Sequence, residues 1–187
     1  MTAVDLDESG RIYSVEMQRM VKKLELDTKR YVDGKVPKFQ RYFRLSHEAR
    51  GKYIRRMYRR LYHRECEKKL LEIPLSVHIG EGLYINHPMC ITINRDAILG
   101  RNINLHKGVT IGQENRGPRK GCPTISDNVW IGVNATIVGK IHIGTDVLIA
   151  PNSFVNCDVP DHSVVVGNPC IIKYRENATE GYLNRCV

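Results

Sequence analysis

The stretch from residue 125 to residue 144 reads ISDNVWIGVNATIVGKIHIG, and it places Ile125, Ile131, Ile137 and Ile143 six residues apart. A period of six is neither the helical period of 3.6 residues nor the strand alternation of two. Hexapeptide repeats are typical of a parallel β-helix, in which three hexads make one triangular coil. We therefore predict a mainly β fold whose sixth-position aliphatic side chains point into the core of a three-sided prism.

The same period extends in both directions from this stretch. Aliphatic residues that follow it stand at positions 73, 79, 85, 93, 99, 105, 111, 125, 131, 137, 143, 149 and 155. The step from 85 to 93 carries two extra residues and the step from 111 to 125 carries eight. Extra residues cannot enter a packed core, so we expect the polar stretch 113–124 (QENRGPRKGCPT) to form an exposed loop. A small residue such as Gly100 or Gly132 often follows the aliphatic one, and we expect it to turn the corner.

The chain ahead of the repeat is of a different kind. Residues 1–72 contain 19 Lys and Arg against 11 Asp and Glu, whereas residues 73–187 contain 10 against 9. The spacing of apolar residues predicts a helix from Ser46 to Leu71, with Ser46 as its N-cap, and a weaker helix from Tyr13 to Leu26. We interpret the many arginines as a solvated helix face rather than a patch for an acidic partner. The expected domains are residues 1–72, 73–166 and 167–187.

Composition excludes several classes of protein. The chain has no apolar run near the ~18 residues of a membrane span, and its start lacks the pattern of an export signal. We therefore expect a cytoplasmic protein whose six cysteines are reduced thiols. No group of Cys and His residues has zinc-finger spacing. A zinc-dependent β-helix carbonic anhydrase is disfavoured because the chain has no H-x4-H pair.

Three segments carry a resemblance to a known family. They are IGEGLYINH at 79–87, LHKGVTIG at 105–112 and VPDHSVVVGNP at 159–169. Together with the hexads, they resemble the hexapeptide-repeat acyltransferases, and within these the serine acetyltransferase-like branch. The resemblance implies a left-handed parallel β-helix, an exception to the usual right-handed crossover. It also implies a homotrimer, or a dimer of such trimers, with active sites between neighbouring prisms, acetyl-CoA as the donor and no metal.

The resemblance assigns roles to individual residues. His87 matches the catalytic histidine, and a neutral imidazole suits a general base near pH 7. Glu72 aligns with the family's aspartate that orients this histidine. Asn86 and His106 occupy stacked positions once the two-residue insertion is allowed for, and with Cys122 they are candidates for binding the substrate. The candidates for binding acetyl-CoA are Gly112, Arg119, Val133, Pro151, Lys173 and Arg175.

Two departures from the serine acetyltransferases shape the expected acceptor. Asn86 stands where the family has an aspartate, and Cys122 stands where it has a second histidine. Both replacements remove charged handles for a free amino acid. We therefore predict an acetyl-CoA-dependent O-acetyltransferase of polysaccharide biosynthesis, acting on a hydroxyl of a sugar or a glycan precursor. The alternatives are a serine O-acetyltransferase of cysteine biosynthesis and, from another class, a non-enzymatic protein whose basic helices bind nucleic acid or a membrane. The leading hypothesis includes no nucleic-acid partner.

Overall fold

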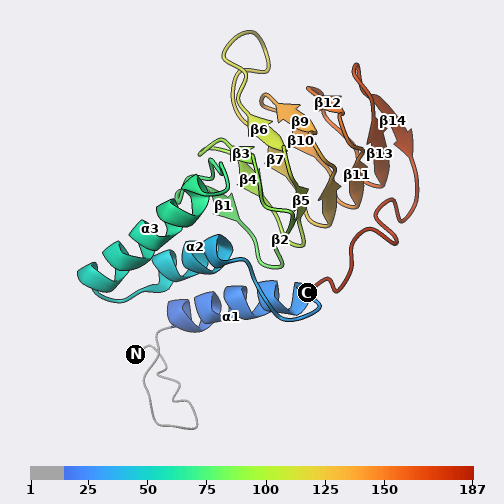
Figure 1. The fold of residues 1–187 in the computed structure, drawn as a ribbon. Helices are drawn as coiled ribbons and strands as arrows, with labels where there is room; N and C mark the ends of the chain where they lie inside the picture. The colour runs from blue at the N-terminus through green and yellow to red at the C-terminus, as the bar shows by residue number, and fades with distance from the viewer. Residues whose placement is uncertain (1–14) are drawn as a thin grey trace, which may run out of the picture.

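Three helices precede a stack of short strands (Figure 1). The computed structural model describes the chain over residues 15–187, and the side chains from residue 23 onward. The helices are α1 (Val15–Arg30), α2 (Lys38–Glu48) and α3 (Lys52–Glu67). Tyr13, where we expected the first helix to begin, lies outside the described residues. Among these residues, no helix has the length and apolar character that crossing a membrane requires.

The predicted continuous helix from Ser46 to Leu71 is wrong. The chain leaves the helical conformation at Ala49, where ψ is 121°, and turns at Gly51, where φ is 95°. Ser46 therefore lies inside α2, where its hydroxyl donates a hydrogen bond to the carbonyl of Phe43 at 2.9 Å instead of capping a helix. Glycine adopts this positive φ without the steric cost that a β-carbon brings. The structure thus has two helices, α2 and α3, in place of the single predicted one. The apolar stripe that predicted the helix begins at Ile54, so it could not indicate a turn at Gly51.

Residues 72–166 wind into a three-sided prism. One coil of the chain places one strand on each face, and successive coils pair in parallel. The first face holds β1 (His78–Ile79), β4 (Ile98–Leu99), β7 (Thr124–Ile125) and β10 (His142–Ile143). The second holds β2 (Tyr84–Asn86), β5 (Asn104–His106), β8 (Val129–Ile131), β11 (Val147–Ile149) and β13 (Ser163–Val166). The third holds β3 (Thr92–Ile93), β6 (Thr110–Gly112), β9 (Thr136–Val138) and β12 (Phe154–Val155).

The core of the prism is the predicted set of aliphatic side chains. All of the sixth-position residues from Ile73 to Val155 are at most 6% exposed. On the second face, the register stacks Ile85 on Leu105 and Leu105 on Ile131, so that equivalent side chains form internal ladders. The mainly β fold, a parallel β-helix preceded by helices, is thereby confirmed.

The corners turn at other residues than we expected. The left-handed backbone conformation occurs three residues after the aliphatic position, as at Asn102 (φ 53°) and Asn128 (φ 58°). The residue directly after the aliphatic one is small for a different reason. A β-carbon on Gly100 would lie 2.3 Å from Asp127 Oδ1 on the next coil, and contacts this short do not occur in proteins. Glycine is therefore required there for close stacking of coils rather than for turning.

Helices α1 and α2, together called the cap, cover the open end of the first coil. Arg44 of α2 donates hydrogen bonds to the carbonyls of Ile79 and Gly80 at 2.9 and 2.6 Å. Asp27 of α1 accepts one from the backbone N–H of Leu83 at 3.0 Å, and it pairs with Arg44 at 2.9 Å. Because β1 and β2 are terminal strands of their sheets, these polar groups have no strand partner. The cap therefore satisfies a sheet edge that would otherwise be exposed.

The C-terminal segment returns along the prism toward the cap (Figure 1). Strand β14 (Ile171–Tyr174) pairs antiparallel with β13, and residues 175–187, called the tail, follow it. Asp146 accepts hydrogen bonds from the backbone N–H groups of Ala178 and Thr179 at 2.9 and 3.0 Å. Near its end, the tail places the N–H of Val187 2.9 Å from Asn102 Oδ1. These contacts fix residues 175–187 against the second face, whereas residues 167–174 of the expected tail include β14.

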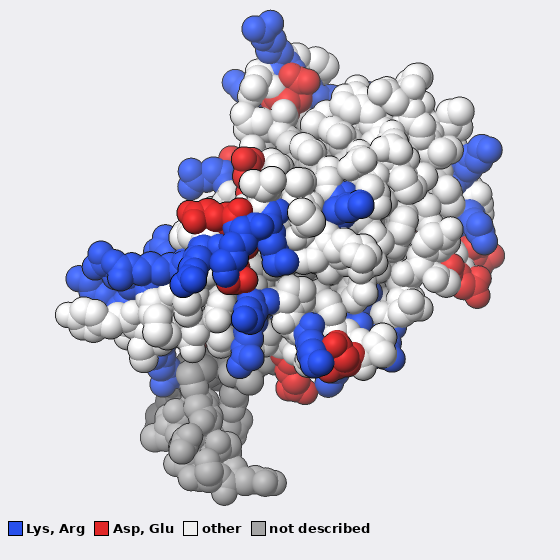
Figure 2. Space-filling view, viewed as in Figure 1, with Lys and Arg blue, Asp and Glu red and all other residues white. Residues whose placement is uncertain are grey.

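Basic side chains gather on the helical segment (Figure 2). Arg55, Arg56, Arg59 and Arg60 of α3 are all exposed, and they line a shallow hollow together with Lys52. Side chains of one sign so close together repel one another and are solvated by water. The arginines of α3 are therefore exposed, and a solvated helix face stays a prediction.

Candidate active site

His87 lies at the edge between the second and third faces. It directly follows β2, it is exposed, and its φ of 56° places it in the left-handed region. The two inserted residues form an irregular stretch between β2 and β3, as predicted. The second-face register aligns His87 with Lys107, Val133 and Pro151 of the following coils. These residues form a line along one edge of the prism, with the imidazole at the end nearest the helices.

Asn86 and His106 lie side by side on the second face. They are direct register partners in β2 and β5, which confirms that they occupy stacked positions. The His106 ring is half-buried, and its centroid lies 4.7 Å from that of Trp130. Burial and the nearby charge of His87 both lower the pKa of His106. His106 is therefore a neutral imidazole at neutral pH, available to donate or accept one hydrogen bond.

Glu72 is not joined to His87. Its backbone pairs with Thr92 ahead of the third face, and Thr92 Oγ1 donates to its carboxylate at 3.4 Å. No hydrogen bond connects Glu72 and His87 in the part of the chain that the structure describes. Within one chain, the expected contact through which Glu72 orients the ring of His87 is therefore absent among the described residues. An orienting role for Glu72 stays a prediction.

Cys122 lies at a different edge from His87. It precedes β7, between the third and first faces, close to the end of β6 at Gly112. Burial, and then the charge of Asp96, raise the pKa of the Cys122 thiol. The thiol is therefore protonated at neutral pH, and its environment does not activate it as a nucleophile.

The candidates for binding acetyl-CoA are distributed over the prism. Val133 and Pro151 follow the same edge as His87, whereas Gly112 ends β6 at the other edge. Arg119 lies in the exposed loop, where its guanidinium donates to the carbonyl of Asn156. Lys173 and Arg175 are exposed on β14 and directly after it. One chain alone does not bring these residues together around His87.

A pocket of about 190 Å³, called the second-face pocket, opens beside Asn86 and His106. Its walls are the outer side chains of the second face, the end of α1 and the tail, including Trp130, Arg30 and Arg185. The sequence analysis missed Arg30 and Trp130. Arg30 is one of 19 basic residues in the first 72, and nothing in the local sequence distinguishes it from the solvated ones. The packing of α1 on the first coils places Arg30 in the same wall as Trp130, and the tail completes that wall.

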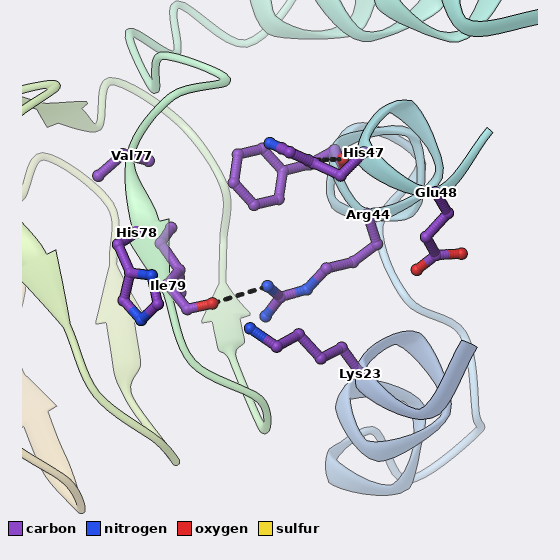
Figure 3. Close-up of a pocket in the computed structure, with 8 residues that line it drawn as sticks. Lys23, Arg44, His47, Glu48, Val77, His78 and Ile79 are labelled. Atoms are coloured by element: carbon purple, nitrogen blue, oxygen red, sulfur yellow. Dashed lines mark hydrogen bonds between the residues drawn. The ribbon is translucent and has the colours of Figure 1, made fainter. Parts of the chain in front are cut away.

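A second hollow lies between the cap and β1 (Figure 3). Arg44 points across it to the carbonyl of Ile79, and the side chain of Lys23 points toward Arg44. The pKa of Lys23 is lowered by burial and then by Arg44, and burial raises that of Glu48. Because Arg44 is engaged by Asp27 and by the sheet edge, the described contacts of this hollow serve the folded structure.

The chain is similar to known enzymes across its repeat region. Residues 122–157 match the model of the family described as bacterial transferase hexapeptide (six repeats). The serine acetyltransferase of Synechococcus elongatus is 37% identical over 105 residues, which are 56% of this chain and 43% of that protein. Serine acetyltransferase 2 of Arabidopsis thaliana is 35% identical over 99 residues, which are 53% of this chain and 31% of that protein. The chain spans less than half the length of these curated relatives.

Solved structures extend the likeness beyond the repeats. The serine acetyltransferase of Neisseria gonorrhoeae in complex with serine is 28% identical, with a TM-score of 0.64 over 82% of this chain and 69% of that one. The soybean serine acetyltransferase apoenzyme gives 25% and 0.67 over the same shares of the two chains. A coenzyme A complex of the serine acetyltransferase from Brucella abortus, at 23% identity and a TM-score of 0.71 over 84% of this chain and 69% of that one, shares the fold.

These relatives correct the expected acceptor. We predicted a sugar hydroxyl because Asn86 and Cys122 replace two charged residues of the family. The curated relatives and the solved structures are serine acetyltransferases, so the sugar hypothesis is wrong and the serine alternative is the one supported. The repeat region of this chain is therefore similar to the bacterial transferase hexapeptide family over residues 122–157, and to serine acetyltransferases over about half of the chain.

Proposed function

We propose that the chain is an acyltransferase that moves the acetyl group of acetyl-CoA to the hydroxyl of serine. The observation that carries the proposal is the position of His87, an exposed imidazole at a prism edge beside the pocket that contains Asn86 and His106. The similarity to serine acetyltransferases at 35–38% identity supports the acceptor. The reaction consumes serine and acetyl-CoA and releases O-acetylserine and coenzyme A.

His87 has the chemistry of a general base for this transfer. Its imidazole takes the proton of the serine hydroxyl while the oxygen attacks the thioester carbonyl. The tetrahedral intermediate then collapses, the C–S bond breaks, and the imidazolium returns the proton to the departing thiolate. Burial, and then the nearby charge of His87, lower the pKa of His106. The neutral imidazole of His106 lines the pocket beside Asn86, where it can donate a hydrogen bond to the acceptor.

We infer that the donor lies along the prism edge that His87 begins. Val133 is half-buried at this edge, so the edge offers backbone and a small apolar side chain to a pantetheine arm. Pro151 has no N–H to contribute, which leaves fewer backbone donors at that coil. Arg119, Lys173 and Arg175 are cations suited to the phosphates of coenzyme A. Because these residues lie on two edges, we propose a homotrimer in which neighbouring prisms complete each site.

The test is thiol release from acetyl-CoA with L-serine as the acceptor. His87→Ala should lower kcat by about 10² to 10⁴, the range that general-base catalysis contributes. His142→Ala is the matched control, because His142 is an exposed histidine on the first face of the same prism, where it contacts Ser126. The control should retain the wild-type rate.

Two results would contradict the proposal at different points. If the wild-type protein releases no coenzyme A with serine, the proposed acceptor is wrong. If it does so and His87→Ala keeps the wild-type kcat, the reaction stands and His87 is not its base.

A further inference from the structure

The second-face pocket contains a buried guanidinium without a carboxylate partner. Arg30 is 3% exposed, and in the described part of the chain no Asp or Glu lies within ion-pair distance of it. Its hydrogen bonds go to neutral oxygens, namely the carbonyls of Gly82 and Asn184 at 2.8 and 2.9 Å and the side chains of Asn102 and Asn104 at 3.4 and 2.6 Å. Burying a charge that no opposite charge balances is costly. We therefore expect the charge of the Arg30 guanidinium to be compensated by another group.

The buried Arg44 of the cap has the carboxylate partner that Arg30 lacks. Arg44 is equally buried, but Asp27 accepts from its Nε at 2.9 Å and from its Nη2 at 3.2 Å, so its charge is balanced. Asp27 is fully engaged there, since it also accepts from Gln40 and from the N–H of Leu83. Among the described side chains, this buried network therefore holds two guanidinium groups, those of Arg30 and Arg44, and one carboxylate, that of Asp27.

The unbalanced cation lines the pocket rather than the closed core. An arginine has five N–H donors, and the four contacts of Arg30 leave one N–H of Nη2 without a partner among the described residues. Arg185 of the tail contributes a second cation to the same wall. Asn86 and His106 form the side of the pocket that leads to His87, since Asn86 directly precedes it.

We propose that the second-face pocket binds the carboxylate of the acceptor through Arg30 and Arg185. This inference rests on the proposed function, because it concerns the amino acid that His87 would deprotonate. The carboxylate would receive the free N–H of Arg30 and the guanidinium of Arg185, and its negative charge would balance the buried cation. The charged handle that is missing at Cys122 is thus supplied by the end of α1 and by the tail.

The chain carries its own reporter for this pocket. Trp130 is the only tryptophan in the sequence, it lines the pocket, and its ring centroid lies 5.0 Å from that of Tyr182 in the tail. Its fluorescence can therefore be titrated with L-serine and with L-serinamide, which replaces the carboxylate by a neutral amide. The wild-type protein should bind L-serine at least about 10-fold more tightly than L-serinamide, because only the carboxylate forms charge-assisted hydrogen bonds with the two arginines.

Two variants test the two arginines. Arg185→Gln changes an exposed residue, and it should weaken L-serine binding about 10-fold while leaving L-serinamide binding unchanged. Arg30→Gln should weaken L-serine binding further than Arg185→Gln does. Because Arg30 is buried, circular dichroism must show that the Arg30→Gln variant is folded. Arg95→Gln, at an exposed position outside the pocket, is the control and should bind both compounds like the wild type.

The outcomes separate this inference from the proposed function. If thiol release with serine is normal but L-serinamide binds as tightly as L-serine, or if Arg185→Gln and a folded Arg30→Gln bind serine like the wild type, the carboxylate pocket is wrong and the transferase stands. If the Trp130 titrations behave as expected but no coenzyme A is released, the pocket stands and the transferase is wrong. If L-serine does not change the Trp130 signal of the wild type at millimolar concentration, the pocket is overturned.

Discussion

The prism and the cap bury opposite kinds of side chain. The interior of the prism is aliphatic, with Leu105, Ile131 and their ladder neighbours fully buried. The interface between the cap and the first coil is polar, and Asp27, Gln40 and Arg44 are buried there within hydrogen-bonding distance of one another. The aliphatic side chains fill the inside of the first coil, and the cap covers its open end.

The two regions differ because their backbone hydrogen-bonding groups find different partners. Inside the prism, the backbone groups pair with neighbouring coils, so that the side chains only need to fill space. At the open end, the carbonyls of Ile79 and Gly80 have no coil to pair with. Side chains with donors and acceptors must replace that missing coil. The prism should therefore respond to a change of volume, and the cap to a change of charge.

The largest effect should come from removing charge in the cap. Asp27→Ala leaves the buried Arg44 guanidinium without its carboxylate. We expect this to reduce the free energy of unfolding by about 3–5 kcal/mol. Urea unfolding at a fixed protein concentration measures this. Glu25→Ala, which breaks the exposed pair between Lys29 and Glu25 at 3.2 Å, is the control and should cost less than about 1 kcal/mol. Equal losses in the two variants would show that the cap does not depend on its buried network.

A change of volume in the prism should come next. Ile137 is fully buried, so Ile137→Ala should reduce the free energy of unfolding by about 2–5 kcal/mol through the cavity that it leaves. Ile137→Val removes a single methylene and should cost about 0.5–1.5 kcal/mol. The two urea midpoints therefore test for a graded response. A valine variant as unstable as the alanine variant would mean that volume does not govern this core.

A smaller effect than that of Asp27→Ala or Ile137→Ala is expected at the contact between the tail and the prism, and it depends on pH. Burial raises the pKa of Asp146, but hydrogen bonds from Thr179 and His162 outweigh burial and lower it overall. A carboxyl whose pKa is depressed by folding stabilises the protein above its unfolded pKa of about 3.9, and this contribution disappears as pH falls through the folded value. Asp146→Asn should cost roughly 1.5–3 kcal/mol at pH 7.

Unfolding of the wild type and of Asp146→Asn, measured between pH 7 and pH 2.5, tests this directly. The difference between the two proteins should shrink steadily below about pH 4. A difference that stays constant over this range would mean that the negative charge of Asp146 does not hold the tail.

The prism could be predicted because its core residues recur with a fixed period in the sequence. One core residue in six, from Ile73 to Val155, is sufficient to set the register of the coils, and the same register placed Asn86 beside His106. The turning residues were misassigned, because both Gly100 and Asn102 recur with the period and only the backbone geometry separates stacking from turning. The break between α2 and α3 was missed, because the predicted helix was extended back from the apolar stripe that begins at Ile54 to a capping residue at Ser46, across Gly51.

The sequence by itself determined the coil, the loop, and the placement of His87 beside an insertion, because each of these follows from a local repeat or its interruption. Only the tertiary structure decided which polar residues meet. Arg30 and Trp130 are one hundred positions apart, and Arg185 is farther still, yet all three line one pocket. Such contacts carry no periodic signal, since they depend on where the end of a helix and a returning tail happen to dock on a finished prism.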